Sequence, residues 1–119
     1  MTGVRPAVPA EYPTVRSICN AAMLAFEART LETGTPLVAS EADRILGALL
    51  LEGTTVEAVA VRPNRRGQGI GSALVRAAAD RRPELDAAFD PDVRPFYESL
   101  GFEIACSAGR CRGRLPADR

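Results

Sequence analysis

Apolar residues near the start of the chain recur at helical spacing. The stripe consists of Val15, Ile18, Cys19, Ala22, Met23 and Phe26. Because residues three and four positions apart share one face of a helix, this stripe is expected to face the core. Pro13 fits such a helix only in its first turn. A short strand from Val4 to Ala7 is expected before it, where Pro6 favours an edge position. The polar segment from Glu27 to Thr35 is expected to form a loop or a frayed helix.

Three apolar runs follow, and short turn-like segments separate them. The runs are Leu37 to Ser40, Ile45 to Leu51 and Thr55 to Val61. Runs of this length joined by short polar connections predict an antiparallel meander of strands.

Helical spacing returns after the meander. The repeated residues are Ile70, Leu74, Ala77 and Ala78, and Pro83 ends the pattern. The next apolar run, Leu85 to Asp90, predicts a strand. Because a helical crossover leads to it, it is expected to be parallel to the strand that ends at Val61. Asp92 is expected to cap a further helix, which Gly101 ends.

The chain is expected to close with a hairpin, Phe102 to Ser107 and Arg110 to Leu115. Cys106 and Cys111 would face each other across it, as a packing pair or a disulfide, and Cys19 is interpreted as a core residue. Three cysteines without CxxC spacing indicate neither a disulfide framework nor a zinc site.

Length and composition indicate one soluble domain over residues 1–119. The 119 residues are 46% hydrophobic with zero net charge, and no apolar stretch approaches the roughly 20 residues of a membrane span. No long basic stretch with aromatics indicates nucleic acid. The expected location is cytoplasmic, with neither membrane nor nucleic acid as a partner. The chain has no histidine and no lysine, so its chemistry depends on carboxylates, tyrosine and backbone dipoles.

The most informative motif connects the third run of the meander to the following helix. It is the glycine loop, residues Arg66, Gly67, Gln68, Gly69, Ile70, Gly71 and Ser72, beside the further arginines 62 and 65. Alternate glycines remove the Cβ atoms that would hold a ligand away, so backbone N–H groups can converge on an anion. The helix start behind them favours negative charge. The motif predicts a diphosphate site.

Two well-known phosphate loops do not match. A mononucleotide P-loop requires a lysine, and this chain has none. The dinucleotide pattern GxGxxG, counted from Gly67, has Ser72 at its third glycine. The RxxGxG pattern of Arg66, Gly69 and Gly71 instead resembles the acetyl-CoA pyrophosphate loop of the GNAT superfamily of N-acetyltransferases.

A second segment supports this resemblance. The residues from Phe96 to Phe102 read FYESLGF and look like the FYxxxGF segment of that superfamily. The resemblance covers about residues 36–107 well and Val4 to Phe26 more loosely. It implies an α/β fold of the α+β type, with a mostly antiparallel sheet flanked by helices. A splayed parallel pair of strands would form the coenzyme A crevice.

The resemblance also assigns roles along the third run. The pantetheine arm would lie along Val59, Ala60 and Val61, whose backbone would supply pairing groups and a donor for the developing oxyanion. Tyr97 matches the usual general acid, which protonates the departing thiolate. No metal is expected.

Glu57 is the best-placed carboxylate to accept the amine proton, through water. It lies in an otherwise apolar run, and alternation puts it on the face of Val59 and Val61. A solvated or ion-paired surface residue is the other open interpretation.

The sequence departs from the family pattern in two places. Asp90 stands where an asparagine often binds the pantetheine region. The part before residue 36 is short, so the acceptor pocket is either reduced or completed by a second subunit in a homodimer.

The sequence therefore predicts an enzyme that moves an acetyl group from acetyl-CoA to a primary amine by direct attack. The acceptor, a small molecule or a peptide, is not specified. A non-catalytic acyl-CoA sensor or partner-binding module is the first alternative, and a nucleotide-binding protein with the same loop is the second.

Overall fold

The computed structural model describes residues 2–22 and 29–116. Within them the strands are β1 (Gly3–Pro6), β2 (Thr35–Glu41), β3 (Arg44–Glu52), β4 (Thr55–Val61), β5 (Leu85–Phe89), β6 (Glu103–Ser107) and β7 (Arg110–Leu115). The α-helices are α1 (Tyr12–Ala21), α2 (Thr30–Thr33), α3 (Ile70–Arg81) and α4 (Arg94–Ser99). Short 3₁₀ turns span Pro9–Glu11, Pro63–Arg65 and Pro91–Val93.

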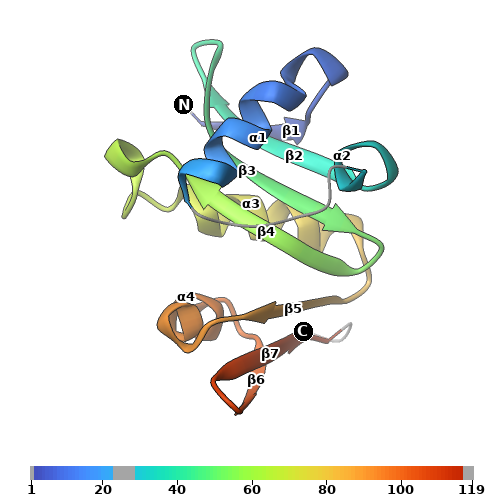
Figure 1. Cartoon of the computed structure of the whole chain (residues 1–119), viewed down its shortest axis with the longest axis vertical. Coiled ribbons are helices and arrows are strands. Elements are labelled where there is room, and N and C mark those ends of the chain that lie inside the picture. The colour runs from blue at the N-terminus through green and yellow to red at the C-terminus, as the bar shows by residue number, and fades with distance from the viewer. Residues whose placement is uncertain (1, 23–28, 117–119) are drawn as a thin grey trace.

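All the described strands belong to one sheet, in the order β1-β2-β3-β4-β5-β7-β6 (Figure 1). Strands β4 and β5 are parallel, and every other neighbouring pair is antiparallel. The predicted fold class is therefore confirmed, including the single parallel pair within a mostly antiparallel sheet.

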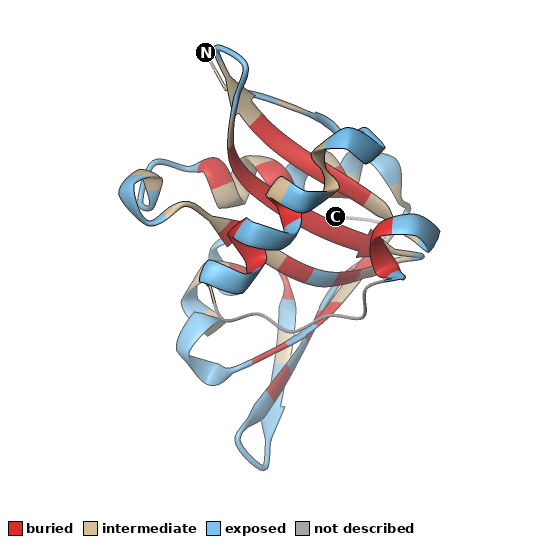
Figure 2. Cartoon of the chain, turned by 45° about the horizontal axis from the view of Figure 1, so that its top comes forward, coloured by how far each residue is buried: buried red, intermediate tan, exposed pale blue. Residues whose placement is uncertain are grey.

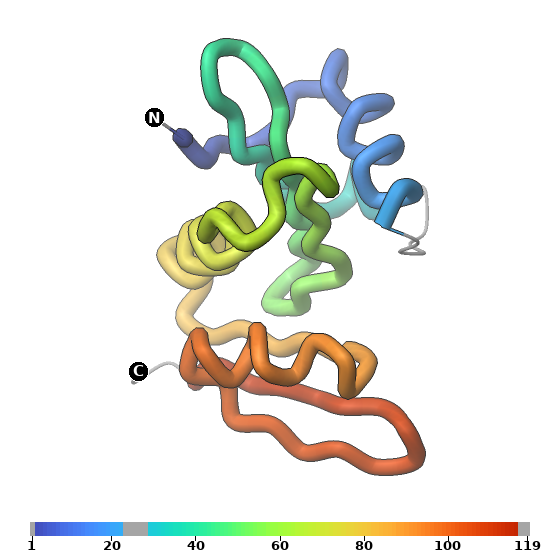
Figure 3. Tube along the Cα trace, turned by 90° about the vertical axis from the view of Figure 1, so that its left-hand side faces the viewer, coloured from blue at the N-terminus to red at the C-terminus, as the bar shows by residue number. Residues whose placement is uncertain are grey.

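Helices cover both faces of strands β2 to β4, while the edge strand β1 is mostly exposed. Figures 1 and 3 show α1 on one face and α3 on the other. The cluster on the α1 face comprises Val15, Ile18, Cys19, Leu31, Val38, Ala48, Leu50, Ala58 and Ala60. The cluster on the α3 face includes Leu37, Leu46, Leu49, Leu51, Val56, Ile70, Leu74, Val75 and Ala78. Because β3 is covered on both sides, its apolar run is continuous instead of alternating.

Strand β4 contains a β-bulge at Glu57. Leu50 of β3 pairs with Ala58, and Leu51 pairs with Val56, so Glu57 has no opposite residue. An extra residue of this kind bends a strand and increases its twist. The bulge lies at the point where β4 stops pairing with β5.

The parallel pair is short. Thr55 pairs with Asp86 and Val56 with Ala87, and β4 and β5 pair at no further described residue. The hydroxyls of Thr54 and Thr55 donate to the Asp86 carboxylate at 2.9 and 2.7 Å, respectively, which fastens the junction. Beyond it the two strands separate, as the predicted splay requires (Figure 1).

The C-terminal strands are covered on one face only. Along β7 the burial alternates strictly, with Cys111, Gly113 and Leu115 buried and the intervening arginines exposed (Figure 2). The buried face joins the α3-side core through Phe89, Tyr97 and other residues. This part of the sheet therefore shows the alternation that one solvated face produces.

Most of the predicted elements are confirmed, and one cap is wrong. Asp92 does not cap α4, because residues 91–93 form a 3₁₀ turn and the helix begins at Arg94 without a side-chain cap. The end of α4 before Gly101 is confirmed. In the first stripe, Met23 and Phe26 lie outside the described residues.

The cysteines follow the predicted pairing. Cys106 and Cys111 form a disulfide across the β6–β7 hairpin. Cys19 is fully buried, and burial raises the pKa of its thiol to about 11, which disfavours thiolate chemistry there.

Candidate cofactor and active site

The glycine loop begins where β4 leaves the sheet. The backbone N–H of Arg62 donates to the carbonyl of Leu46 at 2.8 Å, and its Nε donates to the carbonyl of Ile45 at 2.7 Å. These bonds to β3 hold the strand end in place, so the loop departs from an anchored point.

Gly67 and Gly69 adopt left-handed backbone conformations, with φ of 75° and 81°. A Cβ atom at either position would meet nothing within 4 Å. The conformation, rather than crowding by the protein, therefore requires glycine here. The space beside both residues is open to a ligand.

Six consecutive backbone N–H groups, those of residues 67–72, donate to no carbonyl or side chain of the described residues. The last three belong to the first turn of α3, whose N–H groups have no acceptor within the helix. The 12-residue helix adds its positive end at the same place. Unpartnered donors beside a helix start are the arrangement that binds phosphate in many proteins.

Gly71 also has a packing role that the sequence did not indicate. A Cβ atom there would lie 3.2 Å from the Phe96 ring. The absent side chain of this third glycine therefore makes room for α4, and its part in the diphosphate site stays a prediction.

The three arginines near the loop are held differently. Arg62 is bonded to β3 as described, and Arg65 pairs with Glu41 at 3.3 Å. Arg66 is exposed, and its Nε donates to the carbonyl of Val61 at 3.2 Å. No carboxylate of the described residues pairs with Arg66, so its charge is available to an anion.

The backbone of β4 beyond the bulge pairs on one side only. Residues Val59, Ala60 and Val61 pair with β3, while no described strand pairs with their other edge, toward β5, where the Val61 carbonyl accepts the bond from Arg66. This open edge is the one along which the family resemblance implies the pantetheine arm.

Glu57 is exposed and lies at the bulge, next to that open edge. It forms no ion pair or hydrogen bond with the described residues. Of the two interpretations left open, an ion-paired surface residue has no support here, whereas a solvated carboxylate and a base that works through water both fit.

Tyr97 is deeply buried in an aromatic cluster. It is 6% exposed, stacks on Phe89 with ring centroids 4.2 Å apart, and meets Phe96 and Phe102 edge-on. Phe96 is partly buried and packs against the same core cluster. Burial raises the pKa of Tyr97 to about 12. Its hydroxyl bonds to no described residue, yet no described side-chain polar atom is both fully buried and unpartnered. The hydroxyl therefore reaches solvent.

Asp90, the departure from the family pattern, pairs with Arg110 of β7 at 2.8 Å. Both side chains are exposed. The ion pair thus links the residue after β5 to the first residue of β7.

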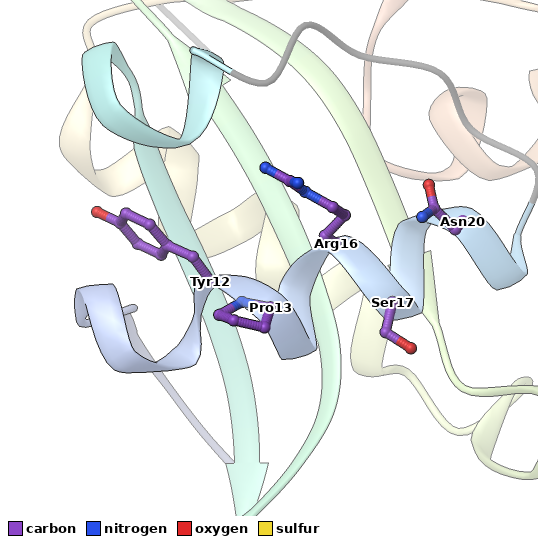
Figure 4. A pocket seen from close by; sticks show the side chains of 5 residues that line it. All are labelled: Tyr12, Pro13, Arg16, Ser17 and Asn20. Carbon is purple, nitrogen blue, oxygen red and sulfur yellow. The ribbon is translucent and has the colours of Figure 1, made fainter.

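A depression on the outer side of α1 was not anticipated from the sequence. Its lining residues are Tyr12, Pro13, Arg16, Ser17 and Asn20, and Figure 4 shows Tyr12, Arg16 and Asn20 extending from one side of the helix. Their spacing of four residues was the available signal. The depression contains none of the predicted site residues.

The described residues contain no cluster of acidic, cysteine or histidine side chains suited to a metal ion. Among the same residues, no helix is both long and apolar enough for a membrane crossing.

Comparison with known proteins agrees with this geometry. Residues 32–104 match the family model of the acetyltransferase (GNAT) domain. The peptidyl-lysine N-acetyltransferase YjaB of Escherichia coli is 32% identical over 68 residues, which are 55% of this chain and 46% of that protein. The match thus spans about half the length of this curated relative.

Solved structures share the fold over nearly the whole chain. The ribosomal-protein-S18-alanine N-acetyltransferase of E. coli has a TM-score of 0.81 at 18% identity and covers 98% of this chain and 94% of its own. The protein yncA from Salmonella typhimurium, solved with acetyl-CoA, has a TM-score of 0.79 at 19% identity and covers 100% and 95%. The family match, together with this fold and the glycine loop, shows that the chain belongs to the GNAT acetyltransferase family.

Proposed function

We propose that the chain is an acetyl-CoA-dependent N-acetyltransferase that acts on a primary amine by direct attack. The observation that carries this proposal is the row of six unpartnered N–H groups at residues 67–72, at the start of α3. Those groups and Arg66 would bind the diphosphate of coenzyme A, and the open edge of Val59 to Val61 would hold the pantetheine arm.

The amine needs a proton acceptor. An alkylamine with a pKa near 10.4 is about 0.04% neutral at pH 7, so forming the nucleophile costs about 4.6 kcal/mol. Glu57 accepts that proton through water, from its exposed place at the bulge. The nitrogen–carbon bond forms as the carbon–sulfur bond breaks.

The departing thiolate needs a donor, and Tyr97 is assigned to it. Because the pKa of Tyr97 is raised to about 12, full proton transfer to a thiolate of pKa near 8.5 is uphill by about 5 kcal/mol. Tyr97 therefore acts as a hydrogen-bond donor that transfers its proton late, and it stays protonated at neutral pH.

The acceptor amine would approach from the α1 side. Tyr12, Arg16 and Asn20 offer polar groups there, and α2 contributes a single turn. A peptidyl-lysine, the acceptor in the name of YjaB, belongs to the amine class that this surface would have to accommodate. A second subunit in a homodimer would enlarge the short acceptor side.

One comparison of thermal midpoints tests the ligand class. At about 100 times its dissociation constant, a ligand stabilises the fold by about 2.7 kcal/mol. Acetyl-CoA is expected to raise the midpoint, and ATP and NAD are not. A shift by ATP or NAD alone would favour the nucleotide-binding alternative and overturn the proposal.

A panel of amines with detection of free thiol tests the reaction. The burial of Tyr97 and the single-turn α2 favour the alternative of a non-catalytic acyl-CoA sensor. Turnover that Tyr97→Phe lowers supports the enzyme, whereas tight binding without turnover on any amine supports the sensor.

A further inference from the structure

A small polar network joins the glycine loop to a turn that is distant in the sequence. Nε of Arg65 donates to Oε1 of Gln68 at 2.8 Å. Nη2 of the same arginine lies 3.3 Å from both carboxylate oxygens of Glu41. Glu41 is the last residue of β2, and the hydroxyl of Thr2 also donates to it at 3.1 Å.

The arginine determines how the Gln68 amide is oriented. A guanidinium can only donate, so its partner atom in the amide must be the oxygen. The NH₂ group of Gln68 is then directed away from Arg65, and it donates to no described residue. Without Arg65 the amide could turn and present its oxygen, which repels phosphate.

The carboxylate in turn holds the arginine. Glu41 forms the only carboxylate contact of Arg65 among the described residues. The bond from Thr2, and then Arg65, keep the pKa of Glu41 below its ordinary value, so the carboxylate is charged at neutral pH.

We propose that Glu41 and Arg65 are positioning residues that fix the Gln68 side chain as a donor to the diphosphate of coenzyme A. Gln68 lies between Gly67 and Gly69, next to the row of unpartnered N–H groups. The inference rests on the proposed function, because it adds one donor to the same phosphate site. It concerns binding alone, since neither Glu41 nor Arg65 touches the reacting atoms.

The test measures binding of coenzyme A by calorimetry to the wild-type chain and three variants. Glu41→Gln and Gln68→Ala are each expected to weaken binding about 5-fold to 10-fold, the loss of one ordinary hydrogen bond. The double variant is expected to match Gln68→Ala, because the carboxylate acts only through that amide. If the two losses multiply, or Glu41→Gln binds like the wild type, the inference is wrong.

Pantetheine, which lacks the diphosphate, separates positioning from general damage. Its affinity is expected to be the same for the wild type and for Glu41→Gln, and an equal loss for both ligands would overturn the inference. Glu84→Gln is the matched control. Glu84, just before β5, pairs with Arg114 of β7 at 2.8 Å and belongs to no part of the proposed phosphate site. Failure of the wild-type chain to bind coenzyme A would instead remove the proposed function.

Discussion

The two parts of the sheet bury their residues differently. In the first part, β1 to β4, strands β2 to β4 lie between α1 and α3, and β3 is buried without alternation. Strands β5 and β7 have one covered and one solvated face, and the edge strand β6 is exposed apart from the half-buried Ile104. Among the described residues, the strands of the two parts pair at only two positions, between β4 and β5, while their buried side chains share the core on the α3 face. Strands β1 to β4 are here the platform, and strands β5 to β7 are the one-sided part. The proposed site uses the open edge of β4 that the short β4–β5 pairing leaves beside the platform.

The bulge at Glu57 explains why the junction is short. The extra residue increases the twist of β4 at the position where pairing with β5 stops. A regular strand would continue the parallel ladder and close the edge of Val59 to Val61. The bulge at Glu57 thus marks the boundary between the platform and the one-sided part of the sheet.

The largest expected effect is on the core of the platform. Leu49→Ala removes a fully buried side chain of β3 and is expected to lower the free energy of unfolding by about 3 to 5 kcal/mol. Ile104→Ala removes the one half-buried side chain of the otherwise exposed edge strand β6 and is expected to cost about 1 to 2 kcal/mol. Urea unfolding measures both, and equal losses would contradict the difference between the two parts.

The next effect concerns Tyr97, which belongs to the one-sided part but is assigned to the reaction. Tyr97→Phe keeps the aromatic cluster, so the unfolding free energy is expected to change by less than about 1 kcal/mol. Under the proposed function, kcat is expected to fall about 100-fold. A large loss of stability with unchanged kcat would make Tyr97 a packing residue only.

The raised pKa of Tyr97 predicts that the folded state loses stability at high pH. The folded value is about 12 and the ordinary value is 10, so the folded state holds the proton more tightly. This contribution to stability is complete below pH 10 and is lost as the pH rises toward 12. Tyr97→Phe is expected to show a weaker decline over that window, measured by urea unfolding at each pH.

A smaller effect is expected from the disulfide of the hairpin. Cys106 and Cys111 close a loop of six residues, and such a short loop limits the entropic stabilisation to about 2 kcal/mol. A reductant is expected to lower the unfolding free energy of the wild-type chain by up to that amount. Cys106→Ser, the control, is expected not to respond, and a response from it would point to another cause.

The smallest expected effect distinguishes Gly67, which the backbone conformation requires, from Gly71, which packing against Phe96 requires. Gly67→Ala meets no atom but forces a left-handed residue, at a cost of about 1 kcal/mol. Gly71→Ala has an ordinary backbone but must displace the Phe96 ring. Binding of coenzyme A and thermal midpoints are measured for both. We expect Gly67→Ala to weaken binding more than Gly71→Ala, and the reverse order would contradict the roles assigned here.

The order and type of the elements could be predicted from local patterns. The limits of β4 and α3 agree with the predicted runs, because apolar spacing and the glycine–proline boundaries are properties of neighbouring residues. The start of α4 could not be predicted in this way. Asp92 is a residue type that often caps helices, but residues 91–93 form a 3₁₀ turn instead.

Parts of the site could also be predicted from neighbouring residues alone. Glycine permits the positive φ values found at Gly67 and Gly69. The opposite holds for the ion pair of Glu41 with Arg65, which joins residues 24 positions apart, and for the depression on α1, whose lining residues carry no family motif.

The amino-acid sequence alone determined the succession of strands and helices, the loop with its alternate glycines, and the family to which these belong. Backbone preferences and hydrophobic periodicity act over a few residues, so they can be read along the chain. Only the tertiary structure decided that Tyr97 is buried, that Gly71 makes room for Phe96 and that Glu57 lies on a bulge. Each of these depends on which distant segments meet, and packing sets that over the whole molecule.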